Sequence, residues 1–208
     1  MKIVSLLKRY PLVGAVCLFI LYVLLYFIGE WLDLPSVITL HSTLDDRIPF
    51  FAYALYPYAG WAFEIAALLL YTYFKRDRDT FVRFVLTVWS AMTVIQLFYF
   101  VCPSEIHLRP AEVPGQGLTS DLVRLLYLTD NNKNVFPSIH VTDAVLMSLL
   151  ERELFGRSGK TYLLYGYNLV VILSTMLLKQ HSTWDVLAGI LCGISAYLIM
   201  RAVSRHRE

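Results

Sequence analysis

Charged residues are scarce in this 208-residue sequence: Asp, Glu, Lys and Arg make up 16% of it, against about 25% in an average soluble domain. The formal net charge of +2 leaves no basic surface for nucleic acid, and a hydrophobic content of 57% excludes a disordered chain. Only three cysteines are present, without metal-ligand spacing, which argues against a disulfide-stapled scaffold. Long apolar runs are abundant instead, and the mean hydropathy of +0.57 indicates an integral membrane protein.

Segments with few or no charges divide the chain and predict its fold class. A helix rises about 1.5 Å per residue, so roughly 20 apolar residues cross a bilayer. Six segments are candidates, the last of them beginning earlier than its uncharged part, near His181: 10–29, 48–74, 84–104, 135–150, 161–178 and 186–200. We therefore predict an all-α polytopic membrane protein with six transmembrane helices in a bundle, forming a single catalytic domain over residues 1–208.

The distribution of Lys and Arg predicts the orientation of this bundle. Thirteen of these residues fall in the N-terminal segment, the second and fourth connections and the C-terminal tail, whereas the other three connections hold five. Cytoplasmic segments carry the excess of Lys and Arg, so we expect both termini on the cytoplasmic side. The connections near 30–50, 103–135 and 176–182 are then expected on the outer, or periplasmic, side of a bacterial inner membrane.

Polar and ionisable residues gather in three segments, and all three open on the predicted outer side. The segments are 102–110, 136–140 and 174–185, each at the end of a predicted helix. Ionisable residues at membrane depth are costly and indicate function by default. The sequence therefore predicts one candidate active site on one membrane face.

Two residues of the third segment have the spacing of a catalytic pair. His181 and Asp185 are four positions apart and would share one face of a helix. A carboxylate that accepts a hydrogen bond from one ring nitrogen selects the tautomer of the imidazole and raises the basicity of the other nitrogen. This arrangement is typical of an activated nucleophile or a general base.

The first two segments supply groups that suit phosphate. Ser138 and His140 follow Pro137, a residue favoured in the first turn of a helix, where free N–H groups and the helix dipole attract anions. Arg109 adds a forked cation, and Lys179 is a second candidate cation. These residues predict a phosphate-binding site beside the catalytic pair.

A metal site is the alternative use of the same residues. His140, His181 and Asp185 form a set of two histidines and one carboxylate, of the kind that binds zinc or iron. Arg109 and Lys179 would repel a metal ion at this place, so we expect neither a metal nor another cofactor. Two histidines, a carboxylate, a hydroxyl and one or two cations at a membrane surface indicate phosphoryl transfer on a lipid headgroup.

The order and spacing of these residues resemble a known family. Three motifs are similar to the signature of the type 2 phosphatidic acid phosphatase (PAP2) superfamily: Arg109-Pro110, Pro137-Ser138-x-His140 and His181-x-x-x-Asp185. The resemblance implies a six-helix membrane enzyme in which His181 attacks phosphorus to form a phosphohistidine and Asp185 orients it. It also implies that His140 is the general acid and that Arg109 and Ser138 hold the phosphate.

Three positions depart from the pattern of that family. Cys102 and Thr175 stand where the family has a Lys and an Arg, and Ile139 replaces a Gly. Lys179 is a candidate for replacing one of the missing cations. The second and third motifs also resemble the branch that contains inositol phosphorylceramide synthases, which pass the phosphoryl-linked headgroup to an alcohol.

The combined interpretation is a membrane-embedded, metal-independent lipid phosphatase that acts at the outer membrane face. Its expected substrate is a lipid phosphate monoester or diphosphate of the phosphatidic acid, phosphatidylglycerol phosphate or isoprenyl diphosphate class. A lipid phosphotransferase with an alcohol acceptor is the first alternative, and a small membrane transporter or scaffold is the second. The lipid, the oligomeric state and the roles of two charges within helices, Glu64 and Asp143, stay open.

Overall fold

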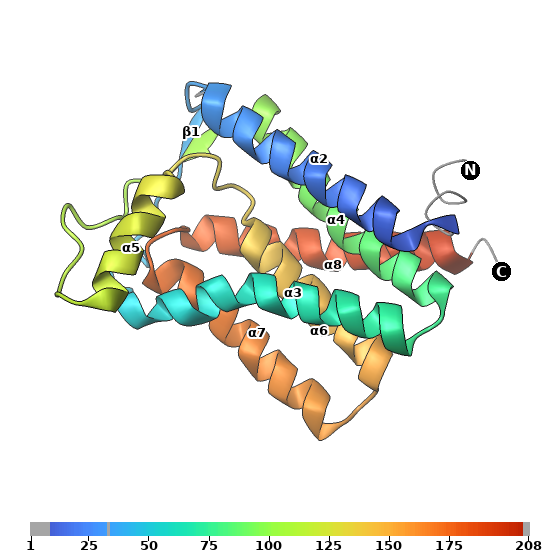
Figure 1. The fold of residues 1–208 in the computed structure, drawn as a ribbon. Helices are drawn as coiled ribbons and strands as arrows, with labels where there is room; N and C mark the ends of the chain where they lie inside the picture. The colour runs from blue at the N-terminus through green and yellow to red at the C-terminus, as the bar shows by residue number, and fades with distance from the viewer. Residues whose placement is uncertain (1–8, 33, 206–208) are drawn as a thin grey trace.

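The computed structural model describes residues 9–32 and 34–205, and this part of the chain is mainly helical, as predicted (Figure 1). Its seven α-helices are α2 (Pro11–Leu32), α3 (Leu55–Lys75), α4 (Arg78–Val101), α5 (Leu118–Thr129), α6 (Ile139–Phe155), α7 (Gly159–Leu177) and α8 (Thr183–Arg205). A short 3-10 helix precedes α3, and two short strands pair in parallel: η1 (Ala52–Ala54), β1 (Ile38–Thr39) and β2 (Ser104–Glu105).

Six of these helices overlap the six apolar segments of the sequence, and α5 lies in the long connection between α4 and α6. Three helices are long and apolar enough to cross a membrane, namely α2, α4 and the Thr183–Ser204 part of α8. The others are shorter or more polar; α6, for example, has 17 residues. A crossing by all six helices and cytoplasmic termini therefore stay predictions. Three residues of the charge count, Lys2, Lys8 and Arg207, lie outside the described residues.

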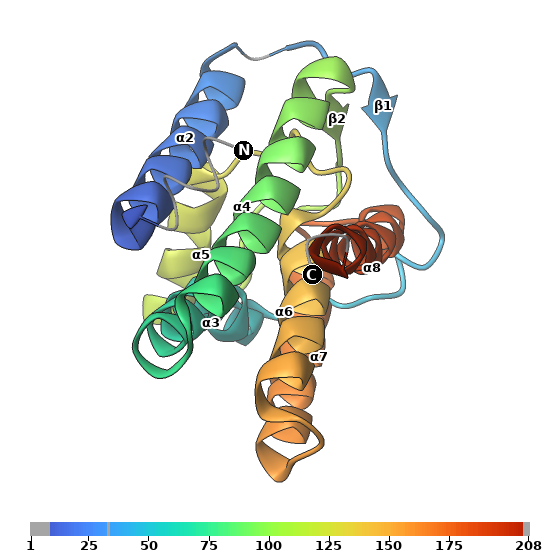
Figure 2. The ribbon, with the colours of Figure 1, turned by 90° about the vertical axis from the view of Figure 1, so that its right-hand side faces the viewer.

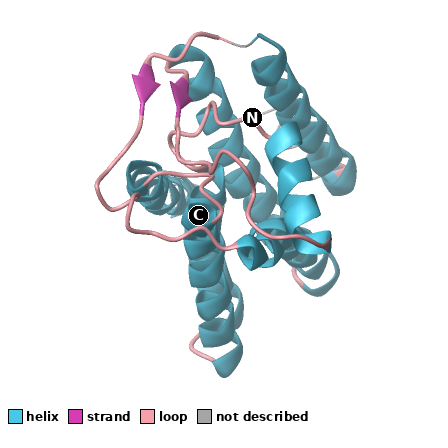
Figure 3. Cartoon of the chain, turned by 90° about the vertical axis from the view of Figure 1, so that its left-hand side faces the viewer, coloured by secondary structure: helices cyan, strands magenta, loops and turns pink. Residues whose placement is uncertain are grey.

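The two ends of the bundle differ in character. Helix α2 begins and α8 ends at one end, while α5 and the strands lie at the opposite end (Figure 1). The turned view shows α2 beside α4, and α6 close to α7 and α8 (Figure 2). From the other side, the strands and the long loops are seen together at the end that carries α5 (Figure 3). The three polar segments of the sequence meet at this end.

The strands and one buried serine hold the loops of this end together. Ile38 of β1 pairs with Ser104 of β2, which ties the chain after α2 to the chain after α4. The hydroxyl oxygen of Ser104 accepts hydrogen bonds from the backbone N–H groups of Val135 at 3.1 Å and Phe136 at 3.0 Å. The segment that enters α6 is thereby held against β2.

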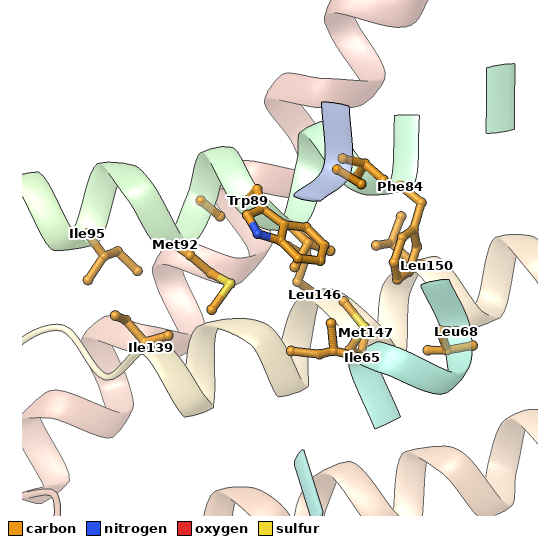
Figure 4. Close-up of a cluster of buried hydrophobic side chains, with 14 of the residues drawn as sticks. Ile65, Leu68, Phe84, Trp89, Met92, Ile95, Ile139, Leu146, Met147 and Leu150 are labelled. Atoms are coloured by element: carbon orange, nitrogen blue, oxygen red, sulfur yellow. The ribbon is translucent and has the colours of Figure 1, made fainter. Parts of the chain in front are cut away.

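The apolar core lies between α3, α4 and α6 (Figure 4). Buried positions of α4 recur at intervals of three or four residues, which places them on one helix face: Phe81, Val85, Val88, Met92, Ile95 and Tyr99. Ile139, Leu146 and Met147 of α6 belong to the same cluster. This packing holds α6, which carries the second polar motif, against α4.

The contact between α6 and α8 is especially close. A Cβ atom at Gly189 would lie 2.9 Å from the carbonyl oxygen of Ser138, and one at Gly193 would lie 2.6 Å from that of Thr142. Glycines four residues apart allow two helix backbones to approach in this way. Helices α6 and α8 therefore start side by side, which brings the second and third polar motifs together.

Candidate active site

A cavity of about 670 Å³ extends from the loop end of the bundle into the space between α2, α3 and α4. Its polar end is formed by Asp130, Asn131, Lys133, His140, Gln180 and His181. Its apolar wall includes Phe19, Val23, Ile65, Trp89 and Met92. Both predicted catalytic histidines thus border one cavity that has a polar end and an apolar wall.

The structure brings His181 and Asp185 together, although not on one helix as predicted. Helix α8 begins at Thr183, so His181 lies two residues before it and Asp185 lies in its first turn. The His181 Nδ1 atom is 3.4 Å from Asp185 Oδ2, which is an ion-pair distance without hydrogen-bond alignment. The same carboxylate oxygen accepts the N–H of Ser182 at 2.7 Å. Asp185 thus holds the turn that carries His181, and Nε2 is the ring nitrogen on the edge opposite the carboxylate.

His140 is the second residue of α6, and its ring lies against two aromatic side chains of α3. Its ring centroid is 4.1 Å from that of Tyr58, in a stacked arrangement, and 4.3 Å from that of Trp61. The centroids of His140 and His181 are 6.2 Å apart. Helix α3 therefore positions one histidine beside the other.

Ser138 is the N-cap of α6, so the helix begins at Ile139 and Pro137 lies before its first turn, not within it as predicted. The Ser138 hydroxyl oxygen accepts the N–H of Val141 at 3.3 Å. The backbone N–H of Ser138 donates to the carbonyl oxygen of Asp185 at 3.3 Å. Ser138 is fully buried and connects the second motif directly to the third.

Arg109 lies behind the polar end of the cavity. Its guanidinium lies 4.4 Å from the ring centroid of Tyr127 and donates to the carbonyl oxygen of that residue at 3.3 Å. It also donates to the carbonyl oxygen of Asn131 at 2.6 Å and to the side-chain oxygen of Gln180. Arg109 thus holds two residues that border the cavity.

Lys179 lies outside the lining of the cavity and is joined to the loop before α3. Its ammonium group donates to the carbonyl oxygens of Asp45 at 2.6 Å and Ile48 at 2.5 Å. The Asp45 carboxylate accepts the Ser182 hydroxyl at 2.8 Å and the backbone N–H of Thr183 at 2.8 Å. Burial raises the pKa of Asp45, but the hydrogen bonds from Thr183 and Ser182 lower it below its usual value. Lys179 and Asp45 thus attach this loop to the connection that carries His181.

Several residues of the site were missed in the sequence. Asp130 and Lys133 belong to a run that is polar at every position from 129 to 134, two residues before the second motif, and this run was a usable signal. Burial raises the pKa of Asp130, and the charge of Arg109 partly opposes this effect. Tyr58 and Trp61 lie three residues apart, on one face of α3. Their spacing alone does not distinguish a site from ordinary packing.

A metal centre was the alternative considered for the same residues. Within residues 9–32 and 34–205, no group of three or more His, Cys, Asp or Glu side chains is placed to hold a metal ion. Thr175, where the resemblance led us to expect an Arg, donates its hydroxyl to the carbonyl oxygen of Ile172 on its own helix. Arg109 and Lys133 are cations near the polar end of the cavity.

The comparison with known protein families shows to which family the chain belongs. Residues 97–208 match the model of the PAP2 superfamily. The chain belongs to the PAP2 superfamily. Members of the PAP2 superfamily are typically phosphatases, which indicates phosphatase or phosphotransferase activity on a phosphorylated substrate.

The matched part contains all three motifs but not the helices that supply much of the apolar wall. Helices α2 and α3 precede residue 97 and lie outside the match. The match does not separate the inositol phosphorylceramide synthase-like branch from the rest of the PAP2 superfamily. No curated protein and no solved structure matches the chain.

Proposed function

We propose that this chain is a membrane lipid phosphatase that hydrolyses a lipid phosphate monoester or diphosphate through a phosphohistidine on His181. The observation that carries the proposal is one cavity with both histidines at its polar end and an apolar wall from α2, α3 and α4. A phosphate beside the histidines would leave the hydrocarbon part of the substrate against this wall. Burial there is worth about 0.8 kcal/mol for each CH₂ group.

The depth of the apolar wall favours a substrate with a long hydrocarbon chain. Phe19 lies 13 residues before Leu32, the end of α2, and Trp89 lies 12 residues before Val101, the end of α4. At about 1.5 Å per residue, the wall reaches roughly 18–20 Å below the loop end. In the proposed orientation this end faces the outer side of a bacterial inner membrane, and a lipid of that leaflet presents its phosphate there.

The proposed reaction begins with attack of His181 Nε2 on phosphorus. A nitrogen–phosphorus bond forms, the bond from phosphorus to the lipid oxygen breaks, and His140 gives its proton to the departing oxygen. The ring centroids lie 6.2 Å apart at the polar end of one cavity, so both histidines can act on one phosphoryl group bound there. The phosphate dianion favours the protonated form of His140, because an opposite charge stabilises the ionised group. The oxygen of a water molecule then attacks the phosphorus and His140 takes up a proton of that water. The nitrogen–phosphorus bond breaks, which regenerates His181 and releases inorganic phosphate.

Two cations and one helix terminus are proposed to stabilise the phosphate. Arg109 supplies positive charge behind the polar end, and the first turn of α6, capped by Ser138, adds the positive end of the helix dipole. Lys133 borders the cavity itself. We assign to Lys133 the role expected of Lys179, because the ammonium of Lys179 donates to two backbone carbonyl oxygens.

The test uses purified protein in liposomes with radiolabelled lipid phosphates of the three expected classes. We expect release of inorganic phosphate, persistence of this activity after exhaustive chelation, and an acid-labile label that is absent from His181→Ala. If label appears in a new phospholipid when diacylglycerol, inositol or ceramide is added, and free phosphate stays at background, the enzyme is a phosphotransferase. If folded protein turns over none of these lipids, the transporter or scaffold alternative takes the place of the lipid phosphatase.

A further inference from the structure

A second polar cluster lies inside the bundle, and its residues do not belong to the lining of the cavity. It consists of Glu64 of α3, Glu151 of α6 and Asn168 of α7, which are 9%, 0% and 1% exposed. Three helices thus contribute one polar side chain each to a place from which solvent is nearly excluded. Such groups are costly to bury unless they are hydrogen-bonded.

The side-chain amide of Asn168 donates a hydrogen bond to one oxygen of each carboxyl group. Its nitrogen donates to Glu64 Oε1 at 3.1 Å and to Glu151 Oε2 at 3.2 Å. Because one amide nitrogen binds both groups, the two carboxyl groups lie side by side. In the described part of the chain, the remaining oxygens, Glu64 Oε2 and Glu151 Oε1, have no hydrogen-bond partner.

Two ionised carboxylates in this place would repel each other, and burial would penalise both charges. A proton on one group removes the repulsion, leaves one buried charge and creates a donor for the partner. A hydrogen bond between a carboxylic acid and a carboxylate is among the strong, charge-assisted kind. We infer that Glu64 and Glu151 bind one proton between their carboxyl groups, and that this acid–carboxylate pair fastens α3 to α6.

The difference in burial favours Glu151 as the group that carries the proton. Its side chain is fully buried, whereas Glu64 keeps some contact with the surroundings, and burial disfavours the charged form most where it is most complete. The other ionisable groups that act on the pair are Lys160 and Tyr167, both of α7. The ammonium of Lys160 lies 3.7 Å from the ring centroid of Phe155, at the end of α6.

The pair is linked to the cavity through α3. Trp61, whose ring lies against His140, precedes Glu64 by three residues on the same helix. A shift of α3 relative to α6 would therefore move Trp61 relative to His140. The proton site holds one wall of the cavity in place, whichever reaction the cavity supports.

Infrared difference spectroscopy tests the proton directly, on the full chain in liposomes. The spectrum of the wild-type protein is compared with those of Glu64→Gln and Glu151→Gln. We expect each substitution to remove one carboxylic-acid C=O band, because the Gln amide replaces the proton as donor to the remaining carboxylate. The matched control is Asp143→Asn, which changes another buried acid of α6 and should leave this band in place.

Other results would overturn the inference. If a single Gln variant keeps an acid band that the double variant Glu64→Gln/Glu151→Gln lacks, both groups are protonated in the wild-type protein. If the wild-type protein has no acid band that the double variant lacks, both groups are ionised. If the site holds a metal cation instead, thermal stability will depend on the Na⁺ or K⁺ concentration, and this dependence will vanish in the Gln variants.

Thermal unfolding provides a second measurement that does not depend on band assignment. The Gln variants should unfold close to the wild-type temperature, whereas Glu64→Ala and Glu151→Ala should unfold well below it. The alanine substitutions leave a buried carboxyl group without its partner, which is the costly case. If Gln destabilises as much as Ala at either position, the shared proton is not what holds the pair.

Discussion

The two sides of His140 are built in opposite ways. Toward α8 the packing is so close that a Cβ atom at Gly193 would meet the carbonyl oxygen of Thr142 at 2.6 Å. Toward α2, α3 and α4 the chain leaves a cavity of about 670 Å³, and Trp61, which lines this cavity, lies against the His140 ring. The packed side, toward α8, fixes the positions of the proposed reacting groups. The open side, toward the cavity, leaves room for substrate. Catalysis requires the first property and binding of a large lipid requires the second.

The largest effect is expected on the packed side, from changes to His181 and Asp185. His181→Ala should reduce turnover to background, and Asp185→Asn should lower it by about 10²-fold or more, since a positioned acid or base contributes about 10²–10⁴-fold. Phosphate release in liposomes measures this effect, with thermal unfolding as the control for folding. Near-normal turnover by folded His181→Ala protein would exclude His181 as nucleophile.

The glycine contact between α6 and α8 should have the next largest effect. Gly193→Ala should separate the two helices and lower turnover by up to about 10²-fold, since misplacement by about 1 Å can cost that much. Overpacking should also cost roughly 1–3 kcal/mol of stability. The matched control is Gly166→Ala on α7, where a Cβ atom would meet nothing within 4 Å. Equal turnover of the two variants would show that this contact does not position the site.

A substitution on the open side should affect substrates according to their length. Ala62 lines the cavity, and Ala62→Trp should exclude two or three CH₂ groups of a bound chain. At about 0.8 kcal/mol for each group, kcat/KM should fall by about 10-fold or more for a long-chain substrate and stay unchanged for a short one. Ala66→Trp, one turn further along α3 and outside the lining, is the control. An equal fall for both chain lengths would contradict a hydrocarbon chain in the cavity.

The smallest effect is expected from Asp45, which joins the loop before α3 to the connection that carries His181. Asp45→Ala removes hydrogen bonds to Ser182 and Thr183 and should cost about 1–3 kcal/mol of stability. The folded-state pKa of Asp45 is lowered from 3.8, so its contribution is present above that pH and is lost as the pH falls below it.

Thermal unfolding between about pH 6 and pH 3 measures this contribution. The wild-type protein should lose stability in this acid range more steeply than Asp45→Ala does. The control is Asp46→Ala, because Asp46 is exposed and pairs with His41 at 2.8 Å on the surface. If both variants follow the wild-type curve, Asp45 does not hold the loop.

Helix positions could be predicted well, but helix ends could not. The apolar segment from residue 48 predicted a helix there, whereas α3 begins at Leu55 after a loop and a short 3-10 helix. Hydrophobic composition does not separate an apolar loop from a helix. The start of α6 was also predicted too early. The hydrogen bond from the Val141 N–H to the Ser138 hydroxyl oxygen sets the first residue of this helix, and apolar composition does not reveal it.

The order and spacing of the motifs predicted which residues would meet, but not all of their contacts. Ser138 and Asp185, 47 positions apart, are joined by a backbone hydrogen bond. Lys179 lies two residues from His181, yet its ammonium is bound by carbonyl oxygens of the loop before α3. Proximity along the chain suggested a phosphate ligand at Lys179, whereas a distant segment of the chain decides where this side chain lies.

The sequence by itself determined the apolar segments that became helices, the three polar motifs and membership of the PAP2 superfamily. These features are local, because apolar periodicity and residue spacing depend on neighbours along the chain. Only the tertiary structure decided that α2 and α3 form much of the wall of the cavity and that Glu64 meets Glu151 and Asn168. Such contacts depend on which helix faces come together. Here the packing of α4 against α2, α3 and α6, and of α7 against α3 and α6, determines them, and no local pattern records that outcome.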